Sequence, residues 1–189
     1  MITKEAKKNQ HTLAMTVALI SWGMLFATLF MGYAVYRSST NVWPPMGFTR
    51  ISLVIPTLST LIILVSSFFC YRMKNDLIEL KYAQSKSNLN MTIVLAVAFL
   101  MSQVFLWKGM NATGIYVSSG IYASIMHALT WIHAAHVIVA VAFLIYLRWQ
   151  FAKNVNTPER LQHTTLNVEK FWHFLGIIWF LMYFILFVF

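Results

Sequence analysis

The sequence predicts an all-α integral membrane protein, in which one domain covering residues 1–189 forms a bundle of five transmembrane helices. Hydrophobic residues make up 59% of the chain and charged residues only 10%, whereas a soluble domain of this size has about 25% charged residues. The few charges divide the chain into apolar stretches long enough for the roughly 20 helical residues that cross a hydrocarbon core. Tryptophans near the ends of these stretches fit this class, because their amphipathic rings prefer the membrane interface.

The first two helices are predicted near residues 13–36 and 50–71. We expect the first to remain uncleaved, because it is long and no small-residue cleavage site follows it. Between them, residues 43–47 read Trp-Pro-Pro-Met-Gly and should form a stiff corner, because proline lacks the N–H group that a helix needs. Pro56 is expected to bend the second helix or to be accommodated by neighbouring groups.

The remaining helices are predicted near residues 90–107, 122–147 and 171–189. The polar segment between the second and third spans is expected to extend the helices on either side of it. Residues 157–159 read Thr-Pro-Glu, which is typical of an N-cap followed by proline at the first helical position. We therefore expect a short surface helix before the fifth span.

The Lys and Arg residues predict the orientation in the membrane. Eleven of the 14 lie at the N-terminus or in the second and fourth connections, and only Arg37, Arg50 and Lys108 lie on the opposite side. The positive-inside rule therefore places the N-terminus in the cytoplasm and the C-terminus outside. The net charge of +9 comes from these short connections, which argues against a nucleic-acid partner.

Histidines inside the apolar stretches are the most unusual feature, because ionisable side chains in lipid are expensive and often functional. His127, His133, His136 and His173 lie within the stretches, whereas all five carboxylates are expected outside the spans. His136 and His173 fall at depths that allow a haem between two helices, so a di-histidine membrane cytochrome stays open. A proton transporter is a weaker alternative, because such proteins place Asp or Glu in their pathway.

Soluble-enzyme chemistry finds no support in the motifs. The chain has no glycine-rich phosphate loop, no zinc-protease motif and no plausible serine triad. Cys70 is the only cysteine and is interpreted as a small buried side chain, so no internal disulfide can form. The class that remains is a structural or interaction subunit, whose polar side chains fix helices to one another or to a partner.

Four stretches, taken in order, resemble subunit III of the haem-copper terminal oxidases, which include cytochrome c oxidase. They are Tyr36-Arg37-Ser38-Ser39 with Trp43-Pro44-Pro45, Ser119-Gly120-Ile121-Tyr122-Ala123-Ser124, His133-Ala134-Ala135-His136-Val137, and Phe171-Trp172-His173-Phe174 with Trp179. The resemblance implies the short, five-helix bacterial form of the family. Quinol oxidases and a nitric-oxide-reductase-associated protein share this scaffold and stay open as relatives.

The resemblance also implies a role without catalysis in a bacterial inner membrane. Such a subunit packs on subunit I, near subunit II, binds phospholipid, and supports proton uptake and stability during turnover. Haem and copper are then expected in the partner subunits, with no catalytic, cofactor-binding or metal-binding residue in this chain. The residues expected to contact lipid or partners are Arg37, Trp43, Arg50, Tyr122, His133, His136, Arg148, Trp172 and His173.

Several acids that the resemblance leads one to expect are absent. The family usually has an acid in the helix aligned with residues 21–36, in the segment aligned with 102–105, and at the positions of Ser119 and Gly176. We expect this chain to keep the scaffold of the family and to have weakened any proton-handling role that depended on those acids.

Overall fold

The computed structural model describes residues 4–45, 47–48, 51–153 and 158–188. It contains five long helices, α1 (Lys4–Ser38), α2 (Val54–Ile78), α3 (Tyr82–Ala112), α4 (Ile121–Lys153) and α5 (Pro158–Met182). A short 3₁₀ turn (Val117–Ser119) precedes α4, and a π-helical segment (Tyr183–Val188) continues α5. All five helices are long and apolar enough to cross a membrane, and no strand occurs in the described part of the chain. The predicted all-α membrane class is therefore confirmed.

Residues 1–41 and 42–189 form two compact units, which are described separately. In the first unit, α1 carries hydroxyl side chains along an otherwise apolar helix. Thr16, Ser21 and Thr28 donate to backbone carbonyl oxygens three or four residues earlier, at 2.7–2.9 Å. Such bonds satisfy the hydroxyl groups within the helix itself, which suits a helix that crosses lipid. The single-domain organisation stays a prediction.

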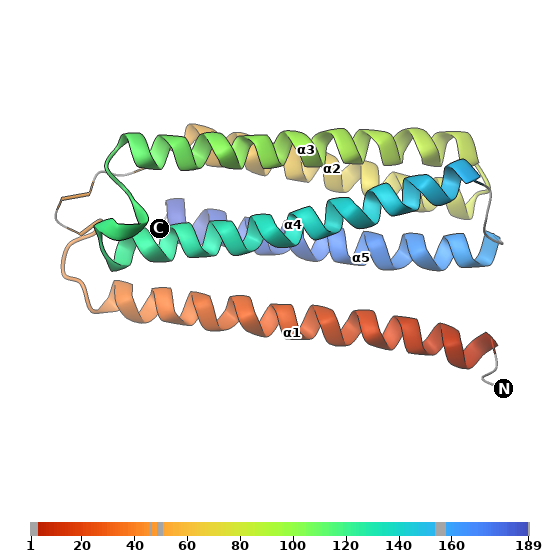
Figure 1. Ribbon diagram of the computed structural model, residues 1–189, viewed down its shortest axis with the longest axis horizontal. Coiled ribbons are helices and arrows are strands. Elements are labelled where there is room, and N and C mark those ends of the chain that lie inside the picture. Colours follow the sequence, from red (N-terminus) through yellow and green to blue (C-terminus); the bar gives the residue numbers. More distant parts are fainter. Residues whose placement is uncertain (1–3, 46, 49–50, 154–157, 189) are drawn as a thin grey trace. The chain divides into compact units, whose positions relative to one another are not determined.

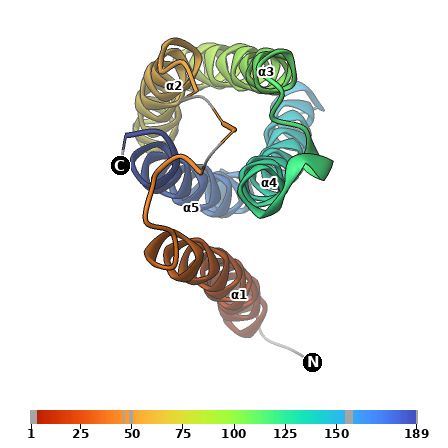
Figure 2. The ribbon, with the colours of Figure 1, turned by 90° about the vertical axis from the view of Figure 1, so that its left-hand side faces the viewer.

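In the second unit, α2, α3, α4 and α5 form a four-helix bundle (Figures 1 and 2). The helices contact one another in a closed order, α2 with α3, α3 with α4, α4 with α5, and α5 with α2. Seen along its axis, this bundle is a ring (Figure 2). The loop between α2 and α3 lies at one end of the bundle, called here the inner end because the charge pattern predicts that it faces the cytoplasm. The opposite end, with the loop between α3 and α4, is called the outer end.

The helices are longer than their predicted spans, because they continue beyond the apolar core. α2 ends at Ile78 and α3 begins at Tyr82, so only residues 79–81 separate them. This confirms that the polar segment extends its flanking helices. The loop is held by a salt bridge of 2.6 Å between Lys81 and Glu79, in which the hydrogen bond from Lys81 lowers the pKa of the Glu79 carboxyl below its ordinary value.

The C-terminal ends of α2 and α3 show the same hydrogen-bond pattern. At the end of α2, the N–H of Lys81 bonds the carbonyl of Asp76 and the N–H of Leu80 bonds that of Leu77. This is a Schellman motif, in which the residue after the C-cap has positive φ and is usually glycine. Here that residue is Leu80, at φ 61°. At the end of α3 the equivalent residue is Gly114, at φ 81°.

Two local predictions are corrected by the helix boundaries. α2 begins at Val54 rather than near residue 50, so Pro56 lies in its first turn, where the missing N–H has no helical partner to lose. No bend is needed to accommodate Pro56. The short surface helix expected before the fifth span is also wrong as a separate element, because α5 runs continuously from Pro158 to Met182. Pro158 does begin the helix, whereas Thr157 lies outside the described residues.

Candidate functional site

The clearest polar site joins α2 and α5 near the inner end of the bundle. Lys74 Nζ donates to Glu169 Oε1 at 2.9 Å, and His173 Nε2 lies 3.5 Å from the same oxygen. His173 and Glu169 are one helical turn apart on α5, and Lys74 approaches from α2. These three side chains are called the inner cluster.

The inner cluster buries one of the five carboxylates inside the helix bundle, close to the predicted start of the fifth span. The Glu169 side chain is only 10% exposed and lies in the candidate span Leu161–Val188, and its partner Lys74 lies in the candidate span Val54–Ile78. A buried carboxylate is tolerated because a cation bonds it directly, so that neither charge is left unpaired in a low-dielectric environment. The predicted site residue His173 therefore has a partner that was not anticipated.

Deeper in the bundle, polar side chains from all four helices are buried together with aromatic rings. The ring of His133 on α4 lies 5.5 Å from that of Trp179 on α5 and 5.9 Å from that of Phe99 on α3. The indole N–H of Trp179 donates to Thr60 Oγ1 of α2 at 3.1 Å. Because His133 is completely buried, these contacts make it a packing residue of the core.

Hydroxyl groups stand in the segment at which the family resemblance leads one to expect an acid. Ser102 on α3 shares a 2.7 Å hydrogen bond with Ser59 on α2, and both are buried. The amide of Gln103 is also buried and donates to Ser102 Oγ at 3.4 Å. At the position of Gly176, a Cβ atom would meet Ser67 Oγ of α2 at 3.4 Å. Neutral hydroxyl groups therefore connect α2 with α3 at the first position, and at the second a hydroxyl group of α2 lies near the backbone of α5.

Two further predicted site residues, His136 and Trp172, lie on α4 and α5 respectively. His136 Nδ1 lies 2.7 Å from the carbonyl oxygen of Ile132, one turn earlier on α4, which orients the ring along its own helix. Trp172 is 1% exposed, so it is a core residue of α5 and not a lipid-facing one. Its indole N–H has no hydrogen-bond partner among the described residues.

His127, which lies in one of the apolar stretches, contacts the backbone of the loop that precedes its own helix. Its Nε2 lies 2.9 Å from the carbonyl oxygen of Ile115, in the loop between α3 and α4. Both residues are buried, and the ring also lies 5.4 Å from that of Trp131. His127 therefore fixes the outer loop to α4.

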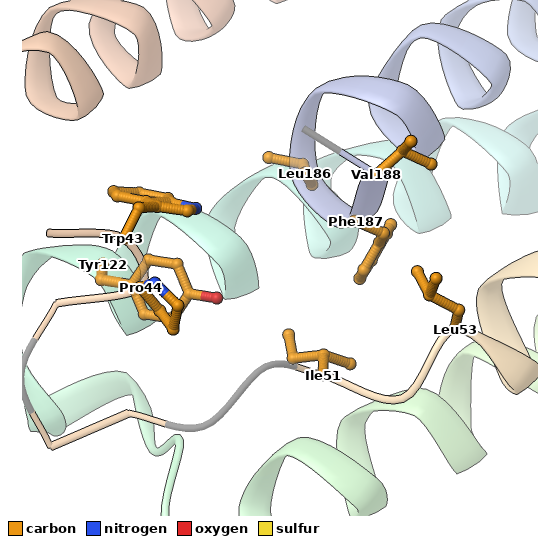
Figure 3. A pocket seen from close by; sticks show the side chains of 8 residues that line it. All are labelled: Trp43, Pro44, Ile51, Leu53, Tyr122, Leu186, Phe187 and Val188. Carbon is orange, nitrogen blue, oxygen red and sulfur yellow. The ribbon is translucent and has the colours of Figure 1, made fainter.

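At the outer end, the predicted corner forms one wall of a small cavity of about 210 Å³ (Figure 3). Trp43, Pro44 and Tyr122 lie on one side of it, and Leu53 and the C-terminal π-helical segment lie on the other. The ring of Trp43 meets the ring of Tyr122 edge to face at 5.1 Å. The structure thus brings together Trp43 and Tyr122, two predicted site residues that are far apart in the sequence.

Two of the three predicted arginines lie in the described part of the chain. Arg148 donates through Nε to Asn90 Oδ1 at 2.7 Å, which joins α4 to α3 toward the inner end. Arg37 lies in the last turn of α1 and is half-buried. Arg50 lies outside the described residues.

The sequence did not predict Lys74 and Glu169 as site residues. Each lies close to other charged residues, and such charged segments are typical of the connections between spans. A usable signal was present: Glu169 and His173 are four residues apart, and therefore face the same side if the fifth helix starts early. No group of three His, Cys, Asp or Glu side chains close enough to hold a metal was found where the structure is described.

Comparison with known proteins agrees with the motif order. The family model described as cytochrome c oxidase subunit III matches residues 3–189. A protein named cytochrome c oxidase subunit 3 from Thermostichus vulcanus is 24% identical over 94% of this chain and 87% of its own length. Proteins of the same name from Synechocystis sp. and Drosophila yakuba are 22% and 27% identical, over 90% and 92% of this chain and 72% and 70% of their own lengths.

Proposed function

Because this chain belongs to the cytochrome c oxidase subunit III family, we propose that it is an accessory subunit, without a redox centre of its own, of a respiratory haem-copper oxidase. The observation that carries this proposal is the family match over nearly the whole chain, together with five helices that can span a membrane. In this proposal the chain packs on subunit I in a bacterial inner membrane, near subunit II. Haem and copper belong to those partners.

The proposal includes phospholipid binding, support of proton uptake, and protection of the complex during turnover. Arg148, toward the inner end, suits contact with lipid headgroups. The Trp43–Tyr122 corner at the outer end suits contact with the membrane interface. Electrons and oxygen are handled by the partner subunits, whether the electron donor is cytochrome c or a quinol. Association with a nitric-oxide reductase is the alternative assembly.

Deletion of the chain tests this function directly. The purified oxidase without the chain should keep its haem content but lose activity over fewer turnovers than the complete complex. Unchanged activity over many turnovers would contradict the proposal. The electron donor is identified in the same preparation by comparing oxidation of reduced cytochrome c with oxidation of a quinol.

Two further measurements address the other classes of function. The isolated chain should show no haem b absorption spectrum; a spectrum that disappeared on replacing His136 or His173 would establish a membrane cytochrome instead. The chain reconstituted alone in liposomes should carry no proton flux across the bilayer. A sustained flux would favour an independent transporter.

A further inference from the structure

We propose that the outward side of α2 and α5 packs against a transmembrane helix of a partner subunit, and that this helix donates a hydrogen bond to His173. The inference rests on the proposed function and deepens it, because it names the side of this chain that meets the rest of the oxidase. This surface is called the α2–α5 face, and it is formed by Leu64, Ser67, Tyr71, His173 and Phe180.

On α2, the face is defined by helical spacing around Ser67. A Cβ atom on Gly176 of α5 would lie 3.4 Å from Ser67 Oγ, so Ser67 stands on the side of α2 that meets α5. Leu64 lies three residues before Ser67 and Tyr71 four residues after it, so they continue this side toward either end of the helix. All three side chains are at least partly exposed, and they form the α2 half of the face.

On α5, the same spacing runs through Gly176. His173 lies three residues before Gly176 and Phe180 four residues after it, so both share the side of α5 that meets α2. Phe180 is exposed, as is Ile177, which lies one turn from His173. These apolar neighbours make the surroundings of His173 unlike the polar lining of a water-filled cavity.

The depth of His173 indicates that lipid alone does not cover this face. His173 is the 13th of the 28 residues in the candidate span Leu161–Val188, and Ser67 is the 14th of the 25 residues in Val54–Ile78, so both lie near the middle of the membrane. The His173 side chain is nevertheless 34% exposed. Hydrocarbon offers no hydrogen bond to a ring nitrogen, and ionisable side chains in membranes therefore face protein or water. A packed partner helix supplies the protein.

The inner cluster determines which group the partner must present. Glu169 is an ionised acceptor paired with Lys74 at 2.9 Å, and His173 Nε2 lies 3.5 Å from the same oxygen. The hydrogen of the neutral imidazole is therefore on Nε2, which leaves Nδ1 as a hydrogen-bond acceptor. Because Lys74 already balances the charge of Glu169, the partner needs no charge of its own. The chemistry that fits is a neutral donor, such as a hydroxyl, carboxamide or indole N–H group.

The exposed side of α3 has a different character. α3 contacts α2 and α4 and lies away from α5 (Figure 2). Val94, Val97, Met101 and Val104 are exposed along it at intervals of three or four residues. Lipid chains can cover this apolar row without leaving a polar side chain unsatisfied. The two surfaces therefore predict different neighbours in the membrane.

Photo-cross-linking of the complete oxidase tests this difference. Benzoylphenylalanine is introduced into this chain at Leu64 or Phe180 on the α2–α5 face, and at Val97 on α3 as the matched control. The three side chains are 51%, 44% and 48% exposed, so the probe is similarly accessible at each position. After irradiation, the probes at Leu64 and Phe180 should join this chain covalently to another subunit of the oxidase. The probe at Val97 should react with lipid or detergent only.

Substitution of His173 tests the hydrogen bond itself. His173→Leu removes the acceptor, and the dissociation constant of the chain from the oxidase should rise about threefold, the effect of one interhelical hydrogen bond in a membrane. His173→Gln keeps an amide that can donate to Glu169 and accept from the partner, so it should bind like the unmodified chain. The cross-linking result does not depend on how well these variants fold.

Probes at Leu64 and Phe180 that react only with lipid, or only with another segment of this chain, would overturn the inference. So would a probe at Val97 that reaches the same subunit equally well, or a His173→Leu chain that binds as tightly as His173→Gln. These results leave the proposed function standing as long as the chain purifies with the haem-containing subunits. A chain that does not purify with them would refute the proposed function, and this inference with it.

Discussion

Replacing Lys74 by methionine is expected to destabilise the helix bundle by about 3 kcal/mol, because it leaves the Glu169 carboxylate buried without its cation. Removal of one partner from a buried ion pair costs roughly 3–5 kcal/mol, and we take the lower limit because Lys74 and Glu169 keep 19% and 10% of their side-chain surface exposed. Methionine preserves most of the lysine volume, so the loss reports the charge and not a cavity. Glu169→Gln should cost a similar amount, because it leaves Lys74 unpaired.

The double variant distinguishes pairing from packing. If the two charges stabilise the bundle through each other, Lys74→Met combined with Glu169→Gln should cost about 3 kcal/mol in total, and not the sum of about 6 kcal/mol. The corresponding coupling free energy of about 3 kcal/mol lies at the upper limit for residues in direct contact.

Equilibrium unfolding of the purified chain in mixed micelles measures these free energies. Lys170→Met is the matched control, since it removes a neighbouring lysine that is exposed and should change stability by at most about 0.5 kcal/mol. Additive losses from the two single substitutions would refute the reasoning. So would a Lys74→Met variant as stable as the control, because Glu169 would then have a different partner.

Three further predictions use the same unfolding measurement. Leu80→Gly should stabilise the chain by about 1 kcal/mol because φ is 61° there, and Gly114→Ala should destabilise it by a similar amount because φ is 81°. A loss of stability in Leu80→Gly, or a gain in Gly114→Ala, would contradict these backbone conformations. His127→Phe should cost about 1–3 kcal/mol, because the buried carbonyl of Ile115 loses its 2.9 Å partner, and an unchanged stability would show that another group bonds this carbonyl. Gly176→Ala should raise stability by up to about 1 kcal/mol through helix propensity, since the nearest atom to the added Cβ lies at 3.4 Å; a marked loss would mean that α2 and α5 approach more closely.

The sequence predicted the membrane class and the number of spans because both depend on composition over about 20 consecutive residues. It was less successful with helix ends. Polar residues at the ends of a span are compatible with a loop or with a helix that continues into water, and hydropathy alone does not distinguish them. For this reason the sequence placed the start of the fifth helix near residue 171, whereas α5 begins at Pro158. The earlier start makes Glu169 a helical neighbour of His173.

The predicted site residues show the same division. Trp43 and Tyr122 were identified from separate motifs, and the structure brings them together at the outer end. The histidines were recognised as unusual, but their partners were not: a backbone carbonyl for His127, aromatic rings for His133 and a carboxylate for His173. Each of these partners depends on how the helix turns or on which loop folds back over it.

By itself, the sequence determined that this chain crosses a membrane with five helices and carries the motifs of the oxidase subunit III family, because hydropathy and motif order are properties of the chain read in one dimension. Only the tertiary structure decided that Lys74 meets Glu169, 95 residues away. The physical reason is that a charge can remain in a low-dielectric interior only beside its counter-charge. Which counter-charge is available was settled by the packing of α2 against α5.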